Sequence, residues 1–592
     1  MASKHVDPIT LEVMRNGLYS IADEMIAALV RTSYSTNIKD RRDASCAVYG
    51  SDGALVAQSA IGTPLHLGTM NWAVHTAMEA YPFDQLEPGD ALAFNLPYPA
   101  GPGHLNDLTL ISPVFWNDAM VAIVANQAHH VDMGGFAPGS MPFGVSEIYQ
   151  EGLQIPPIRL FRKGELVDEL WRIIQQNVRS KTEVEGDLMA QFAANVVGGR
   201  RFGELVDKYG VDTAETYLGA MLDYSERRMR AALQAIPVGR YSFEDVLEGD
   251  GLTDQHYTIR LTLEVRGDSV VADFTATDAA ARGPLNCRLP SVAACVFYVL
   301  KAALDPDLPP NAGAYRPIEV LVRDGSLLSA QYPEAVCNAN ILTTQRIVDV
   351  LLGALAEAIP ERVLAACSGT MNLINVGGVD RRTDTYFNYV ETYAGGQGGM
   401  HDLDGMDAVQ NHMTNTRNAP VEAIESAYPL RVEAYGLEPD SEGAGAQRGG
   451  CGLRREIRVL CPEVLFTLSS DRAEVAPWGL EGGSSASPSR CFIRRPDGSE
   501  RHLPSKVTTY VEEDETIVIV TPGGGGWGDP ARRDPELVAE DVRKGLISVE
   551  RARDAYHVAV SPTTLELDVE QTAQFRRGAG KAEDAAGNRG IP

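Results

Sequence analysis

Two apolar, strand-like runs at 108–116 and 121–126 constrain this chain most, because residues that can bind a metal stand at their ends. His104 and Asp107 come just before the first run, and His129 closely follows the second. If the runs form a hairpin, the start of one strand lies beside the end of the other, so the three side chains meet at one edge of the sheet. Two imidazoles and a carboxylate suit a divalent metal that keeps an open coordination position.

A histidine at the end of a strand can equally be an ordinary hydrogen-bonded polar residue. A further carboxylate favours the metal, because Asp43 precedes the strand-like run SCAVYG, which a turn at Ser51-Asp52-Gly53 would return through ALVAQ. His66 lies in the loop GTPLHLG, between Asp43 and His104 in the sequence. It either lines the same pocket or serves as a hydrogen-bonded loop histidine.

Further polar residues follow the second run. His130 and Asp132 come after His129 in AHHVDMGG, and we expect them to orient the metal ligands or to act as a general base. Glu147 and Glu151 lie in the next loop and are candidate acid/base residues, with a solvated loop face as the alternative. The predicted catalytic set is therefore His130, Asp132 and Glu151.

The composition excludes several classes of protein. The net charge of −28 argues against nucleic acid or an anionic membrane surface as a partner. No apolar stretch reaches membrane-spanning length, and the opening MASKHVDPIT lacks the apolar core of a secretion signal. The eight cysteines are scattered without a paired framework, so we expect reduced thiols and a cytoplasmic protein.

Hydrophobic periodicity changes along the chain and predicts both helices and strands. Asp7-Pro8 opens an amphipathic helix, and 180–235 reads as helical with interruptions at Asp187 and at the Gly198-Gly199 break. Apolar residues alternate with polar ones within 241–277, as in an antiparallel sheet. Glycine then recurs between short strands from 443 to 528.

We therefore predict a multi-domain α+β protein in which mixed and antiparallel sheets are flanked by helices. A chain of 592 residues is too long for one core. The predicted units are an N-terminal metal-binding α+β domain at 1–236, a central α+β domain at 237–440, a β-rich domain at 441–530, C-terminal helices at 531–577 and a disordered tail at 578–592.

A glycine-rich polar stretch, AGGQGGMHDLDGMDAVQNHMTNT, begins at Ala394. Glycine lets a backbone approach a ligand closely, so contact with substrate or at an interface is one interpretation, and a second metal site or a buried turn network are the others. Gly523–Gly526 is not a phosphate-binding loop of the GxxxxGK[ST] kind, because Trp527-Gly528-Asp529 follows. If ATP is used, we expect it to bind elsewhere.

Longer motifs resemble one family over about residues 6–560. They include NIKDRRDASCAVYGSDG, HLNDLTLISPVF, AHHVDMGG, IYQEGLQIPP, the stretch from Ala394 to Glu425, and TPGGGGWGDP. These segments resemble the hydantoinase B/5-oxoprolinase family, which contains the smaller subunit of ATP-dependent hydantoinases, caprolactamase, and subunits of acetone and acetophenone carboxylases. The resemblance implies that Asp43, His104, Asp107 and His129 hold a divalent metal.

The resemblance also implies a division of labour between two subunits. A larger hydantoinase A-type subunit would bind ATP and phosphorylate a cyclic amide such as a hydantoin or lactam. The present chain would contribute one divalent metal (Mn, Zn or Fe) for ring opening within a hetero-oligomer. The alternative inside the family is a subunit of an acetone- or acetophenone-type carboxylase, in which the same site would serve C–C bond formation. A non-catalytic scaffold, whose histidines only stabilise loops, is the alternative outside enzymes.

Overall fold

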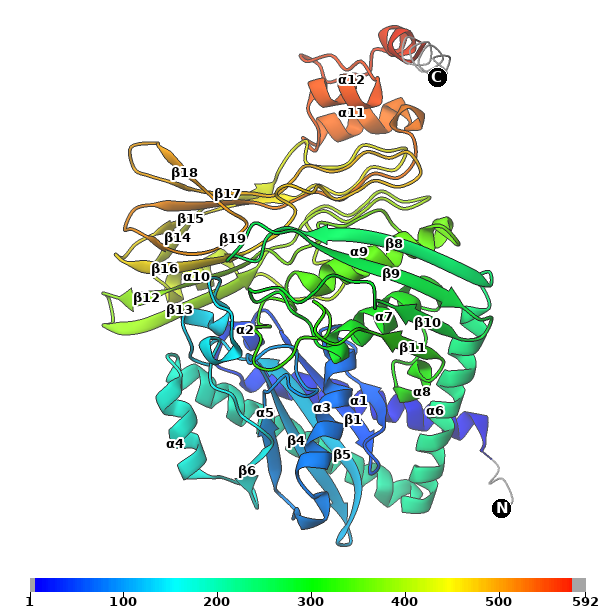
Figure 1. Cartoon of the computed structure of the whole chain (residues 1–592), viewed down its shortest axis with the longest axis vertical. Coiled ribbons are helices and arrows are strands. Elements are labelled where there is room, and N and C mark those ends of the chain that lie inside the picture. The colour runs from blue at the N-terminus through cyan, green and yellow to red at the C-terminus, as the bar shows by residue number, and fades with distance from the viewer. Residues whose placement is uncertain (1–5, 578–592) are drawn as a thin grey trace.

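The computed structural model describes residues 6–577 (Figure 1). It confirms the predicted α+β class, with four multi-stranded sheets in the described part of the chain. The N-terminal part, drawn in blue and cyan, lies at one end of the molecule, and the strand-rich C-terminal part lies beyond the central sheet (Figure 1). The helices α11 (Pro535–Arg543) and α12 (Val549–Tyr556) lie at the opposite end of the molecule.

The first sheet is antiparallel and has the strand order β2-β1-β5-β4-β3-β6-β7. Its strands are β1 (Ala44–Gly50), β2 (Leu55–Gln58), β3 (Ala91–Phe94), β4 (Asp107–Trp116), β5 (Ala119–His129), β6 (Ile158–Arg162) and β7 (Glu165–Leu166). Helices α1 (Pro8–Thr32) and α5 (Lys181–Tyr209) cover one face, and α3 (His66–Ala80) covers the other. Because both faces are covered, β1 is buried at every position.

The two long helices on this sheet pack closely against each other. Helix α1 begins as predicted, because the side chain of Asp7 accepts a hydrogen bond from the amide of Thr10 (2.8 Å). The predicted interruptions at Asp187 and at Gly198-Gly199 are wrong, since α5 runs through all three residues. A Cβ atom at Gly198 would lie 2.4 Å from Sδ of Met25, so this glycine brings the two helices together instead of ending one.

The second sheet has the order β11-β10-β9-β8, with β8 at Gly239–Leu247, β9 at Tyr257–Val265, β10 at Val270–Asp273 and β11 at Ile318–Leu321. The alternation in the sequence correctly predicted the antiparallel strands β8, β9 and β10, while β11 joins in parallel. Helix α9 (Thr343–Ala356) packs on this sheet, and α7 (Leu289–Leu304) lies between α9 and α3. One continuous hydrophobic core therefore extends from the first sheet to the second.

Two further sheets share a core in the C-terminal part. Their orders are β13-β12-β16-β19 and β14-β15-β20-β17-β18. The strands are β12 (Leu373–Asp380), β13 (Thr385–Thr392), β14 (Leu430–Leu437), β15 (Leu453–Val459), β16 (Val464–Ser469), β17 (Arg490–Arg494), β18 (Glu500–Leu503), β19 (Lys506–Val511) and β20 (Thr516–Val520). Each sheet combines strands from both sides of residue 440, where we placed a domain boundary, so that division stays a prediction.

The remaining helices are α2 (Thr36–Lys39), α4 (Asp168–Asn177), α6 (Val211–Leu233), α8 (Ala312–Tyr315) and α10 (Val421–Ala427). Within residues 6–577, no helix combines the length and the apolar character needed to cross a bilayer. All eight cysteines are buried and free. The tail that we expected to be disordered, 578–592, lies outside the described residues.

Candidate metal centre

Three neighbouring strands bring the predicted ligands to one edge of the first sheet. Asp107, the first residue of β4, pairs with His129, the last residue of β5. Asp43 lies immediately before β1, the strand on the other side of β5, and its carbonyl accepts a hydrogen bond from the amide of His129 (3.0 Å). His104 reaches the same edge from the loop before β4. The predicted hairpin is confirmed, and it places these residues together because antiparallel pairing sets the start of one strand against the end of the next.

The side chains of His104, Asp107 and His129 form a buried triangle. The Nε2 atom of His104 lies 3.0 Å from Oδ1 of Asp107, and Nδ1 of His129 lies 3.3 Å from that oxygen and 3.1 Å from Nε2 of His104. Each residue is at most 3% exposed. Ligand atoms placed ~2.0–2.1 Å from a tetrahedral ion lie about 3.3 Å from one another, so the spacing suits a metal ion.

Hydrogen bonding fixes the proton of His104 on the side away from the triangle. Nδ1 of His104 lies 2.9 Å from the carbonyl oxygen of Cys337, which can only accept, so Nδ1 carries the hydrogen. When His104 is neutral, the lone pair of its Nε2 atom therefore faces Asp107 and His129. A cation at the centre would satisfy three electron-rich atoms that otherwise repel one another, and a histidine oriented by a carbonyl is a usual feature of metal sites. The residues present therefore fit a divalent metal.

Burial and the neighbouring charges shift the pKa values of the three triangle residues in different directions. Burial alone would raise the pKa of Asp107, but the neighbouring charge of His104 and hydrogen bonds from the histidines hold that pKa well below its usual range. Burial alone would lower the pKa of His104, and the Asp107 carboxylate outweighs it and raises that pKa. Burial dominates at His129, whose pKa is lowered. The site thus keeps an ionised carboxylate next to an imidazole that is easily neutral, as metal binding requires.

Other polar groups complete a small cavity around the triangle. Asp43 lines it and accepts a hydrogen bond from Oγ1 of Thr63 (3.1 Å), but Asp43 lies outside the group of three atoms that face one another. His66, the first residue of α3, places Nε2 3.7 Å from Oδ2 of Asp107, and its Nδ1 lies 3.0 Å from Oγ of Ser45. His66 is therefore both a lining residue and a hydrogen-bonded one. The cavity has a volume of about 30 Å³.

The structure places His130 and Asp132 away from the triangle. Side chains alternate in direction at the end of β5, so His130 points to the other face of the sheet, where its Nε2 lies 2.9 Å from Oε1 of Gln191 on α5. Asp132 accepts hydrogen bonds from the backbone amides of Gly134 (3.1 Å) and Arg179 (2.7 Å), and it pairs with the Arg179 guanidinium (2.9 Å). Both residues hold the loop that follows His129, and a direct catalytic role for them stays a prediction.

Glu151 is connected to the triangle through the backbone of Cys337. Its Oε1 atom accepts hydrogen bonds from the backbone amides of Val336 (2.6 Å) and Cys337 (2.9 Å), and the carbonyl of Cys337 is the partner of His104. Burial raises the pKa of Glu151 to about 7, against the opposing effect of these two amides. Glu147, the other candidate in this loop, is exposed and caps a short helical turn. Glu151 is thus placed to position His104 through the segment 336–337.

Glu151 predicts a pH dependence of stability. A carboxyl whose pKa rises from 4.5 to about 7 on folding binds its proton more tightly in the folded state, so the free energy of unfolding falls as the pH rises through that interval. We expect the free energy of unfolding of metal-stripped wild type to fall by about 2–3 kcal/mol between pH 5 and pH 8, and we expect no such fall in Glu151→Gln. Urea unfolding at a series of pH values measures the difference, with the exposed Glu185→Gln as the control. Parallel pH profiles for wild type and Glu151→Gln would contradict it.

Two contributions to the site come from distant segments that the motifs did not reveal. Asn340 donates from Nδ2 to Oδ2 of Asp107 (3.3 Å), and a Cβ atom at Gly103 would lie 2.1 Å from Oδ1 of Asn340, so a larger residue there would displace the Asn340 side chain. Cys337 supplies the carbonyl that orients His104. The signal available in the sequence was only that asparagines interrupt the apolar stretch CNANILTT.

The stretch from Ala394 divides into two parts with different roles. Its glycines interlock with other backbone segments: a Cβ atom at Gly396 would lie 2.0 Å from the carbonyl of Gly450, and one at Gly524 would lie 2.0 Å from the carbonyl of Gln397. This part is a buried backbone network, which also accounts for the TPGGGGWGDP motif. The second part reaches the metal cavity, which Met413 and Thr414 line.

The fold and the cluster together define an α+β protein that buries two histidines and a carboxylate in the arrangement of a metal site. The chain belongs to the hydantoinase B/oxoprolinase family, whose sequence model matches residues 7–530. The resemblance noted from the motifs is thereby confirmed.

Relatives of known name agree with this assignment. A protein of Pseudomonas sp. named as one of the subunits of a D-/L-hydantoinase is 33% identical, over 97% of this chain and 98% of its own. The beta chain of the caprolactamase of Pseudomonas jessenii is 31% identical over 94% and 96% of the two chains. A crystal structure of the ATP-dependent caprolactamase from that organism matches with a TM-score of 0.88, covering 97% of this chain and 100% of that one. An acetone carboxylase structure matches with a TM-score of 0.91, covering 99% of this chain and 84% of that one, at 20% identity, and shows the fold alone.

Proposed function

We propose that this chain is the metal-binding subunit of an ATP-dependent cyclic amide hydrolase of the hydantoinase/5-oxoprolinase type. The observation that carries the proposal is the buried triangle of His104, Asp107 and His129, in a chain that is about 30% identical over nearly its whole length to subunits named for hydantoin and caprolactam. Asp43 is the fourth ligand in this proposal. Mn, Zn and Fe all suit the mixed nitrogen and oxygen donors.

ATP is assigned to a larger, hydantoinase A-type partner. The relatives are named as subunits, and caprolactamase is described as ATP-dependent. Gly523–Gly526 is fully buried against other backbone and is therefore closed to a phosphate chain. Phosphorylation by the partner would turn the unreactive amide into an electrophile with a good leaving group. We place the resulting hetero-oligomer in the cytoplasm.

The residues of this chain prepare the site for that electrophile. A divalent ion bound here would supply Lewis acidity and lower the pKa of water at the site. His104 keeps its proton on Nδ1, against the carbonyl of Cys337, so that Nε2 stays available as a ligand. Apolar side chains wall the cavity and exclude bulk water; these are Leu65, Ile341, Met371, Leu373 and Met413. In this proposal His130 and Asp132 act by holding the loop that follows His129, and Glu151 acts by positioning His104 through the segment 336–337.

A ketone carboxylase is the second candidate, because the fold also matches acetone carboxylase. We favour the hydrolase, since three relatives that are 31–34% identical to this chain are named for hydantoin, 5-oxoproline or caprolactam.

Bicarbonate separates the two functions. The complex with its partner should couple ATP cleavage to opening of a hydantoin or lactam ring, with the same rate in bicarbonate-depleted and bicarbonate-supplemented buffer. Chromatography of the acid product together with an ADP assay gives the readout. ATP turnover that needs bicarbonate and a ketone would refute the hydrolase assignment in favour of the carboxylase.

A further inference from the structure

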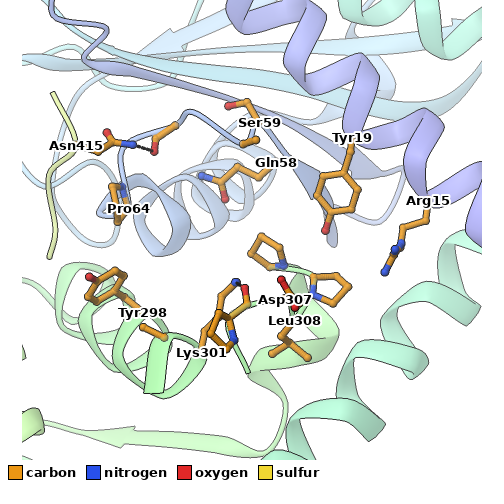
Figure 2. Close-up of a pocket in the computed structure, with 16 residues that line it drawn as sticks. Arg15, Tyr19, Gln58, Ser59, Pro64, Tyr298, Lys301, Asp307, Leu308 and Asn415 are labelled. Carbon is orange, nitrogen blue, oxygen red and sulfur yellow. Dashed lines mark hydrogen bonds between the residues drawn. The ribbon is translucent and has the colours of Figure 1, made fainter. Parts of the chain in front are cut away.

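The metal cavity is too small for a substrate ring. A volume of about 30 Å³ holds an ion and one or two water molecules, because each water needs ~10–15 Å³ by this measure. A cyclic amide must therefore be held beside it. A larger cavity of about 510 Å³ lies between α1, the end of β2, α7 and the loop 306–310 (Figure 2).

The two cavities share one thin wall. Thr63 and Thr414 line the metal cavity, while their chain neighbours Gly62, Pro64 and Asn415 line the larger one. The wall is tied by a hydrogen bond from Nδ2 of Asn415 to the carbonyl of Gly62 (2.9 Å), drawn as the dashed line in Figure 2. Only two short backbone segments, 62–64 and 414–415, therefore separate a molecule in the larger cavity from the proposed metal ligands.

Two side chains that line the larger cavity carry polar atoms without a hydrogen-bond partner in the described part of the chain. Gln58 is 3% exposed and its Oε1 atom has no hydrogen-bond partner among the described residues, and the same holds for the buried hydroxyl of Tyr19. Figure 2 shows both side chains entering from the wall formed by α1 and β2, opposite Tyr298 and Lys301. Buried polar groups without partners are costly, which indicates that a polar ligand completes them.

The charge of the lining favours an anion. Two cations, Arg15 and Lys301, face one carboxylate, Asp307, although the whole chain carries a net charge of −28. The ammonium of Lys301 donates to the carbonyl of Pro306, and Arg15 pairs with Glu12 at the exposed rim while its buried Nε has no partner in the described chain. The rest of the lining is largely apolar and includes Tyr298, Leu308, Pro309 and Pro310.

We propose that this cavity receives the cyclic amide in its anionic, O-phosphorylated form, with Arg15 and Lys301 at the phosphoryl group, Gln58 and Tyr19 at its polar edge, and Tyr298 against the ring. The proposal rests on the function proposed above, which supplies such an anion from the partner. The wall between Gly62 and Asn415 is where the reacting carbon passes to the metal cavity.

Binding to the full chain tests the site directly. The probe is phenyl phosphate, a ring that carries a dianionic phosphoryl group, titrated by calorimetry against phenol and inorganic phosphate. We expect phenyl phosphate to bind and phenol not to bind, and Lys301→Met and Arg15→Met each to weaken binding about tenfold or more, the cost of one charge-assisted hydrogen bond. Lys544→Met, at an exposed lysine that directly follows α11, should bind as wild type does. Equal affinity in all four proteins would overturn the proposal.

The same variants separate this site from the metal site. Lys301→Met should keep the metal content and thermal unfolding of wild type, and in the complex it should lower the product formed per ADP about tenfold at limiting substrate. If Lys301→Met and Arg15→Met kept wild-type coupling while His104→Ala abolished it, the cavity assignment would fail and the proposed function would stand. If His104→Ala also kept wild-type coupling, the proposed function would fail.

Discussion

His104→Ala should lose the divalent metal and lower ring opening by the complex on the order of 10³-fold or more, while the chain still folds. The expected loss is large because His104 contributes one of the three side-chain atoms that form the triangle. The fold should survive, since His104 lies in a loop at the edge of the sheet and its removal breaks no strand pairing. Asp107→Asn keeps the shape and removes the charge, so it should lose the metal as well.

Elemental analysis of the purified proteins gives the readout, with circular dichroism to confirm folding. Wild type should carry about one tightly held divalent ion per chain. The control is His256→Ala, an exposed histidine paired with Glu474 far from the triangle in sequence, which should keep its metal. Equal metal in wild type and His104→Ala would show that the triangle is not the metal site.

His129→Ala should uncouple the complex. Because the partner carries out phosphorylation in the proposed division of labour, ATP consumption stimulated by the substrate should continue in part, while the ring-opened acid falls to near background. The isolated wild-type chain should neither bind ATP tightly nor open a ring. Simultaneous measurement of ADP and acid tests this, and Glu185→Gln serves as a surface control. Full coupling in His129→Ala, or ATP-independent ring opening by the isolated chain, would contradict the mechanism.

The sequence predicted the centre of the site because strand geometry is local. Two apolar runs separated by a short turn can pair in only a few ways, and antiparallel pairing alone puts Asp107 beside His129. The register of β1 then adds Asp43 by the same rule. The α+β class could also be predicted from the change in hydrophobic periodicity, because that periodicity is likewise a local property of the sequence.

What the sequence did not reveal depends on contacts between distant segments. Cys337 and Asn340 reach His104 and Asp107 from more than two hundred residues away, and no local pattern predicts that approach. Side-chain alternation along β5 could have predicted that His130 points to the opposite face of the sheet from His129. We instead placed His130 at the site because it follows His129 in the motif. Gly198 looked like a helix break, whereas the structure uses its missing side chain for the contact between α1 and α5.

The protonation of the candidate metal site could not be read from the sequence, because it depends on how its buried charges are arranged. Asp107 and Glu151 are both carboxyl groups buried near His104, yet the pKa of Asp107 is held low and that of Glu151 is raised to about 7. Asp107 has direct contact with two histidines, whereas Glu151 has only two backbone amides against the cost of burial.

The most direct measurement of the central claim is the ratio of ring-opened acid to ADP in the complex, after this chain has been stripped of metal with a chelator and again after reloading. The proposed function predicts a ratio near zero for the stripped complex, with ATP still consumed, and recovery to about one acid per ADP on reloading with Mn, Zn or Fe. Reloading should not restore the ratio in His104→Ala. An unchanged ratio after stripping would contradict the claim that ring opening depends on a metal at His104, Asp107 and His129.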